Sequence, residues 1–201
     1  MSKTEAHQIA LVSAVQRLAN IDLTRQCIQS GLSAPINNKL LLRAFGADIE
    51  LSIPEFDGIY LQSGQPLTAV DRILILHYLL AQQPLHGDNQ ELSFREFPGG
   101  TFYWDAFVNR TTRPLVTAIK NNLTLLRSRL NRYDCTLVCH GDLGMRIKGI
   151  GMAAVTLIYW QGDDELQPSA EILFNQTIKT VYCTEDAAVL ASRICLGLLR
   201  D

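Results

Sequence analysis

The residues best suited to chemistry in this sequence lie in one short segment, residues 93–103, between two segments with helical patterns. Arg95 carries a planar guanidinium whose donors match a carboxylate or a phosphate. Gly99 and Gly100 follow it, and glycines let the backbone adopt positive φ angles and come close to a ligand. We therefore expect a loop in which backbone N–H groups and a guanidinium surround a small anion.

The alternative for this loop is a tight turn without a ligand. In that case Arg95 forms an internal salt bridge with Glu96 or Asp71. In the ligand-binding hypothesis, the anion lies beside Tyr103, which follows the two glycines, and beside Arg110, the next arginine along the chain. The predicted ligand-binding residues are Arg95, Gly99, Gly100, Tyr103 and Arg110.

Carboxylates and a histidine at two strand ends offer a second kind of chemistry. Asp163, Asp164 and Glu165 follow a long apolar segment, and crowded carboxylates can have a raised pKa or hold a hard cation. His140 and Asp142 lie on one side if their strand continues, and such a pair could orient a general base. These five residues are candidates for acid–base or metal-assisted catalysis. Solvated loops at strand ends are the alternative.

The cysteines do not form a recognisable metal or disulfide framework. Cys135 and Cys139 are the closest pair, with His140 beside the second. If this segment is a strand, the two cysteines lie roughly 13 Å apart at about 3.3 Å per residue, which is too far for one tetrahedral metal. The sequence therefore predicts no metal site and leaves any cofactor unknown.

Composition limits the class of partner. The chain has 201 residues, of which 47% are hydrophobic and 19% charged, and its net charge is −2. An electrostatic binder of nucleic acid or of a membrane surface would be more basic. Residues 110–132 are locally basic without interleaved aromatic residues. An anionic partner or cofactor could bind there, a solvated helix face is the usual alternative, and nucleic acid is not expected. We expect no nucleic-acid partner, no membrane and a cytoplasmic location, because no apolar run resembles a signal peptide or a membrane span.

Hydrophobic periodicity predicts an α+β protein, with about five helices packed on antiparallel or mixed β-sheet elements in a single layer-type core. One domain, 1–201, is expected, with a helical segment 1–33 on an α+β body 36–201. The segment 153–160 has almost no polar residues, which indicates a central strand covered on both faces. The expected helices are 4–19, 22–31, 68–80, 113–131 and 184–198, and the expected strands are 39–45, 49–53, 59–61, 136–139, 145–150, 153–160 and 171–174.

Several separated segments, 76–80, 93–103, 160–165 and 172–174, resemble in order an uncharacterised family, domain of unknown function 3786. The similarity covers most of the chain after about residue 36. The resemblance implies a link to anaerobic bacteria and archaea, and some members are joined to a four-cysteine iron–sulfur segment of the kind found in corrinoid proteins of one-carbon metabolism. These 201 residues contain no such segment.

Three hypotheses for function follow. The first is an accessory or ligand-binding domain for a small anionic cofactor or metabolite, in a one-carbon or corrinoid context by family resemblance only. The second is an enzyme that uses the histidine and carboxylate cluster. The third is a protein-interaction partner of a metabolic enzyme. Convergence of the carboxylates and His140 with Arg95 in one pocket would favour the enzyme.

Overall fold

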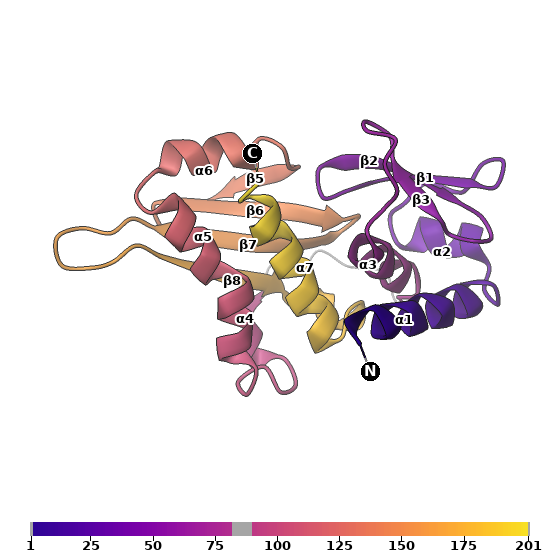
Figure 1. Ribbon diagram of the computed structural model, residues 1–201, viewed down its shortest axis with the longest axis horizontal. Helices are drawn as coiled ribbons and strands as arrows, with labels where there is room; N and C mark the ends of the chain where they lie inside the picture. Colours follow the sequence, from indigo (N-terminus) through magenta and orange to yellow (C-terminus); the bar gives the residue numbers. More distant parts are fainter. Residues whose placement is uncertain (1, 82–89, 201) are drawn as a thin grey trace.

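The computed structural model describes residues 2–81 and 90–200, which form two lobes side by side (Figure 1). The elements of the first lobe are α1 (Lys3–Leu18), α2 (Leu23–Gln29), β1 (Lys39–Ala44), β2 (Ala47–Ser52), β3 (Gly58–Tyr60) and α3 (Ala69–Leu79). The elements of the second lobe are β4 (Glu91–Ser93), η1 (Phe94–Glu96), α4 (Trp104–Arg110), α5 (Thr112–Ile119), α6 (Leu123–Leu130), β5 (Cys135–Val138), β6 (Leu143–Ile150), β7 (Ala153–Trp160), β8 (Ser169–Asn175), η2 (Gln176–Thr180) and α7 (Thr184–Gly197).

One antiparallel sheet runs through both lobes, in the order β3-β2-β1-β6-β7-β8-β4, with β5 also paired to β6. The lobes meet where β1 pairs with β6, at the single residue pair Ala44 and Ile150. Beyond that pair the two strands separate. The α+β class predicted from the sequence is confirmed, while the prediction of a single domain stays a prediction.

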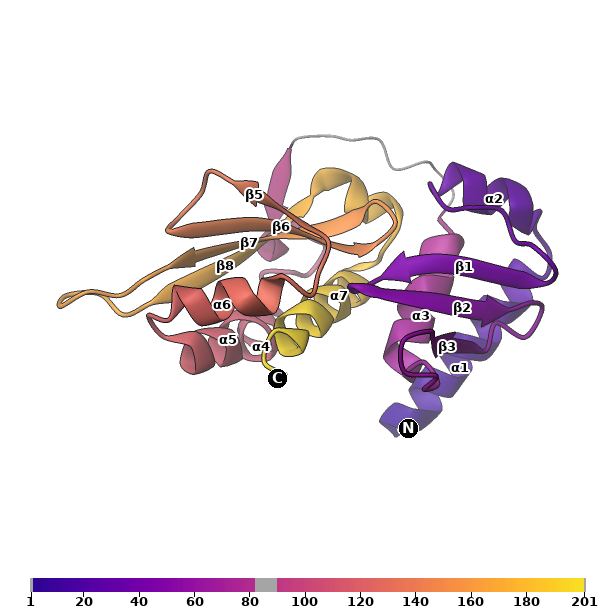
Figure 2. The ribbon, with the colours of Figure 1, turned by 90° about the horizontal axis from the view of Figure 1, so that it is seen from above.

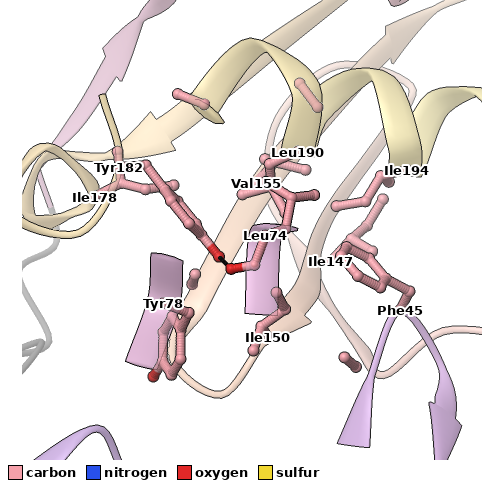
Figure 3. Packing of buried hydrophobic residues seen from close by; sticks show 14 of the residues in the cluster. Phe45, Leu74, Tyr78, Ile147, Ile150, Val155, Ile178, Tyr182, Leu190 and Ile194 are labelled. Carbon is pink, nitrogen blue, oxygen red and sulfur yellow. Dashed lines mark hydrogen bonds between the residues drawn. The ribbon is translucent and has the colours of Figure 1, made fainter. Parts of the chain in front are cut away.

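Helices cover one face of the sheet in the second lobe (Figure 2). Alternate residues of β6 and β7, such as Ile147 and Val155, are buried against Leu190 and Ile194 of α7 (Figure 3). All of β7 except its last residue is buried, which confirms the predicted central strand. The opposite face of the sheet is called here the outer face. Among the described residues, no helix combines enough length and apolar character to cross a membrane.

The turn between β1 and β2 anchors the first lobe in the second. The N–H of Phe45 donates to the carbonyl of Gly149 at 2.7 Å, and its ring lies 4.8 Å from the guanidinium carbon of Arg193. Gly46 has a φ of +78°, and a Cβ there would lie 2.0 Å from the carbonyl oxygen of Arg132. Only glycine fits this position without a shift of the backbone.

Two buried tyrosines add hydrogen bonds to the core at the joint. Tyr78 on α3 donates to the carbonyl of Ser30 at 2.6 Å and accepts from the N–H of Met152 at 3.0 Å. Tyr182 donates to the carbonyl of Leu74 at 2.9 Å (Figure 3). Burial raises the pKa of both hydroxyls. A buried hydroxyl with a partner is stable, whereas one without a partner would be costly.

The prediction of one helix over 113–131 is wrong. Lys120 has a positive φ of 50° and ends α5, and the side chain of Asn122 caps α6 by accepting from the N–H of Leu125 at 2.9 Å. A side-chain cap and a left-handed residue interrupt the backbone hydrogen bonds, although the apolar stripe continues across the break. The helical spacing of Leu115, Ile119, Leu126 and Leu130, all of which are buried, indicates the buried face of both helices but not the break between them.

The sequence offers a capping residue at three helix starts, namely Asp22, Thr68 and Thr184. Asp22 accepts from the N–H of Arg25 at 3.0 Å, and Thr68 accepts from the N–H of Asp71 at 3.1 Å, as expected. The final helix differs, because the hydroxyl of Thr184 donates to a loop carbonyl and does not cap the helix.

Candidate functional site

Arg95 lies on the surface of the second lobe and does not face a described hollow. Its guanidinium carbon lies 4.3 Å from the ring centroid of Trp104, a cation–π contact. The adjacent carboxylate of Glu96 accepts from the N–H of Ser93 at 2.6 Å, so it caps the short helix η1. Both expected internal salt-bridge partners, Glu96 and Asp71, have other contacts. Arg95 therefore has a local aromatic partner and an open side.

The two glycines beside it have different structural roles. Gly99 has a φ of +73°, a conformation that favours glycine. At Gly100, a Cβ would lie 1.9 Å from the carbonyl oxygen of Phe94, so the glycine permits close packing of two backbone segments. Phe102 and Tyr103 follow, 84% and 54% exposed, with their rings edge to face at 5.0 Å. The loop presents aromatic side chains to solvent.

Arg110 is separated from the other predicted ligand-binding residues. It lines a hollow with residues of α1, α3 and α7, and this hollow includes none of the other four. Its Nη1 lies 3.9 Å from the carboxylate of Glu185, a long and exposed ion pair. The five residues therefore do not form one described pocket, and their joint role stays a prediction.

The acid–base candidates lie at exposed strand ends and line none of the described hollows. Asp142 accepts from the N–H of Gln161 at 2.7 Å, which ties two loop ends together. Backbone N–H groups of Leu166 and Glu165 hold the pKa of Asp163 below its ordinary value. That shift stabilises the carboxylate, in contrast to the raised pKa that a general acid needs.

Another polar cluster, which sequence reasoning missed, joins α3 to the start of α7. Nδ1 of His77 lies 2.8 Å from Oδ2 of Asp186, and the thiol of Cys183 donates to the same oxygen at 3.3 Å. Burial raises the pKa of that thiol, which keeps it in its poorly nucleophilic form. No group of three or more metal-ligating side chains occurs in the described part of the chain. We interpret the cluster as structural.

The largest described hollow lies where β1 separates from β6. It has a volume of about 700 Å³ and adjoins a second hollow of about 340 Å³ on the outer face. Asp134, Lys148 and Gly151 line both, so we treat them as one junction groove. The remaining lining residues are Gly31, Leu32, Ser33, Leu41, Leu42, Arg43, Asp48, Ile49, Leu61 and Gly149 in the larger hollow, and Cys135, Thr136, Arg146, Met152 and Ala154 in the smaller.

Two cations of β6 line the smaller hollow. Arg146 and Lys148 are two residues apart, so both lie on the outer face, while Ile147 between them is buried in the core. Strand register places Thr136 and Thr156 directly on either side of Arg146. In the described structure neither Arg146 nor Lys148 has a side-chain hydrogen bond or ion pair. The smaller hollow therefore presents two unpaired cations beside Thr136. Thr156 does not line the hollow, and its hydroxyl donates to the carboxylate of Glu91.

The two acidic residues of the groove share one cation. The guanidinium of Arg43 binds Asp134 at 2.5 Å and Asp48 at 3.0 Å. The hydrogen bonds that Arg43 donates to the two carboxylates, with that to Asp134 as the larger effect, raise the pKa of Arg43. Because one guanidinium offsets only one of the two carboxylates, the charged lining residues of the groove carry one net positive charge. Arg146 and Lys148 form no ion pair with either carboxylate, since both bind Arg43.

The sequence contained one signal for this groove. Arg146 and Lys148 alternate with apolar residues inside a predicted strand, a pattern that places both cations on one face. The pattern did not show that β5 and the first lobe would border the same face, because strand neighbours are not visible from one sequence.

The fold and the groove define a two-lobed α+β protein with a cationic groove between its lobes. The chain belongs to the family described as Domain of unknown function (DUF3786), which matches residues 22–196. This confirms the resemblance noted from the sequence. No curated protein and no solved structure matched the chain. All lining residues of the junction groove lie inside the matched range.

Proposed function

We propose that this protein binds a small organic anion in the junction groove. The observation that carries the proposal is the pair Arg146 and Lys148, two neighbouring cations on one strand face that lack partners in the described structure and line a hollow. Unpaired cations in a concave, partly apolar site are typical of sites that bind an anionic group.

The side chains around the pair support this chemistry. Arg146 offers a planar fork that matches a carboxylate or phosphate, and Lys148 adds a compact charge. Thr136, across the strand pair, can donate a hydroxyl hydrogen bond to the same group. Hydrogen bonds to charged groups contribute about 1.5–3 kcal/mol each, which is enough for micromolar binding when several act together.

The larger hollow can hold the rest of such a ligand. Leu41 and Leu61 are apolar lining residues that are about half exposed, and burial of their surface favours binding. The ligand class is therefore an anion with a larger organic body, such as a phosphorylated or carboxylated metabolite or cofactor. A cytoplasmic accessory role in one-carbon or corrinoid metabolism belongs to this proposal by family resemblance alone.

The test compares a double variant with a matched control. Arg146→Ala/Lys148→Ala removes the cation pair, while Arg127→Ala removes an exposed arginine of α6 that does not line the groove. Isothermal titration would use inorganic phosphate, citrate and adenosine monophosphate as probes, and native mass spectrometry would detect a retained anion. We expect at least about tenfold weaker binding in the double variant and no change in the control.

Two results would overturn the proposal. One is unchanged affinity for every probe in the double variant. The other is the absence of both a retained anion and measurable binding in the natural protein, across all three probes.

A further inference from the structure

Another hollow, separate from the junction groove, is lined by residues of α1 and α3 from the first lobe and of α4 and α7 from the second. We call it the α1–α7 cleft. Its volume is about 330 Å³, near the lower end of the range for small-molecule sites. Its lining residues are His7, Thr68, Val70, Arg110, Glu185, Ala188, Val189, Ser192, Arg193, Leu196, Gly197 and Arg200.

Part of the cleft wall is apolar and accessible. Val70 comes from the start of α3, and Ala188, Val189 and Leu196 come from α7. Leu196 is 43% exposed, whereas Ile194 and Cys195 on the same helix are fully buried. Covering this apolar wall would remove hydrocarbon surface from water, which favours an apolar ligand body.

Cationic side chains surround this apolar wall. Arg200 has no side-chain partner in the described structure. Nε of Arg110 donates to the carbonyl of Ala106 at 3.2 Å, and its ion pair with Glu185 is long, at 3.9 Å. Arg193 is neutralised because it forms two hydrogen bonds with the buried Asp71. Two arginines therefore face a single carboxylate, which leaves one net positive charge before any protonation of His7.

We infer that the α1–α7 cleft binds a monoanionic amphipathic molecule, a carboxylate or sulfonate with an apolar body. The apolar body would lie against Val70, Val189 and Leu196, and the anionic group would bind Arg110 and Arg200. This ligand differs from that of the junction groove in its smaller size and larger apolar share. The inference does not depend on the proposed function, because the two hollows share no lining residue.

The cleft also includes residues beyond the family match. His7, Gly197 and Arg200 lie outside residues 22–196, whereas the junction groove lies entirely within them. Of the two arginines assigned to the anionic group, Arg200 therefore lies outside the matched region and Arg110 lies inside it.

The experiment uses 8-anilinonaphthalene-1-sulfonate, a fluorescent amphipathic anion, with displacement by decanoate and by the neutral analogue decan-1-ol. The test variants are Arg110→Ala, Arg200→Ala, Arg200→Glu and Leu196→Trp, the last of which fills the cleft. The controls are Arg127→Ala and Leu137→Trp, which alter an exposed arginine and an exposed leucine outside the cleft.

We expect saturable dye binding that decanoate displaces at least about tenfold more effectively than decanol. Each arginine-to-alanine change should weaken the dye about tenfold, Arg200→Glu more strongly, and Leu196→Trp should abolish binding. Both controls and Arg146→Ala/Lys148→Ala should bind as the natural protein does. Equal displacement of the dye by decanol and decanoate would overturn the inference, as would retained dye binding in both Leu196→Trp and Arg200→Glu. If Leu196→Trp does not fold, dye binding by Arg200→Glu decides.

Discussion

Asp71 holds Arg193 through two parallel hydrogen bonds, with Oδ1 2.7 Å from Nε and Oδ2 3.0 Å from Nη2. Asp71 lies on α3 of the first lobe and is fully buried, while Arg193 lies on α7 of the second lobe. Tyr60 donates a further hydrogen bond to the same carboxylate. Burial by itself lowers the pKa of Arg193, but the hydrogen bonds and charge of Asp71 outweigh it and raise the pKa. This contact fixes one lobe against the other.

Asp71→Asn should therefore destabilise the protein strongly. The substitution leaves the guanidinium of Arg193 largely buried without a counter-charge, which typically costs about 3–5 kcal/mol. Chemical denaturation at neutral pH measures the loss. The matched control is Asp57→Asn, which removes an exposed partner of Arg72 and should cost less than about 1 kcal/mol. The double variant Asp71→Leu/Arg193→Met should be more stable than Asp71→Asn, because no buried charge is left without a partner. Equal losses of unfolding free energy in Asp71→Asn and Asp57→Asn would contradict this account.

The sequence predicted the local role of Asp71 but not its main contact. Thr68 and Asp71 have the spacing of a capping box, and the hydroxyl of Thr68 does accept from the N–H of Asp71. The carboxylate, however, binds an arginine 122 residues away. Caps depend on neighbours in the chain and can be predicted, whereas a buried ion pair between lobes depends on the packing of the two lobes.

The hypothesis drawn from the sequence and the proposed function both involve an anion, but at different places in the fold. The sequence favoured an anion and directed attention to Arg95, because an arginine followed by two glycines occurs within a few residues. The residues of the junction groove come from β1, β2, β5, β6, β7 and from connecting segments beside α2, β3 and β5, so their proximity depends on strand order. Strand order among antiparallel neighbours is a tertiary property, and the pairing of β1 with β6 has no local signal.

Gly100→Ala should destabilise the loop after η1 more than a typical glycine substitution. The new Cβ would lie 1.9 Å from the carbonyl oxygen of Phe94, which forces a backbone shift. Overpacking of this kind costs about 1–3 kcal/mol. Gly64→Ala is the control, because Gly64 also lies in a turn and has nothing within 4 Å of its Cβ position. Its φ is +66°, so the substitution is penalised only for the left-handed conformation, at about 1 kcal/mol. Thermal unfolding would show whether Gly100→Ala lowers the melting temperature further than the control.

Arg95→Ala separates the anion-binding prediction for this loop from a structural role. Loss of the contact with Trp104 should cost only about 0.5–1 kcal/mol, since the guanidinium is exposed. If the loop binds an anion, titration with phosphate or citrate should show at least about tenfold weaker binding in Arg95→Ala. If the junction groove is the anion site, Arg95→Ala should bind as the natural protein does, and Arg146→Ala/Lys148→Ala should not. Arg95→Lys, which keeps the charge, is the control.

Stability should fall as the pH rises above about 9–10, the unfolded-state range for thiols and tyrosines. Burial raises the pKa of Tyr182 and raises that of Cys195 to about 12, so the folded state keeps protons that the unfolded chain has lost. Each such group lowers the free energy of unfolding by up to about 1.4 kcal/mol per pH unit between its two pKa values. Below that window the contribution is intact.

Tyr182→Phe tests the alkaline effect at one position. At pH 7 it should cost about 1 kcal/mol, because the hydrogen bond to the carbonyl of Leu74 is lost. Between pH 10 and 11 the difference from the natural protein should shrink, because phenylalanine has no proton to lose in the unfolded chain. Tyr103→Phe, at an exposed ring, should follow the natural protein at every pH. Denaturant titrations at pH 7 and 10.5 measure both differences, and a Tyr182→Phe difference that stays constant would show that its hydroxyl does not contribute to alkaline unfolding.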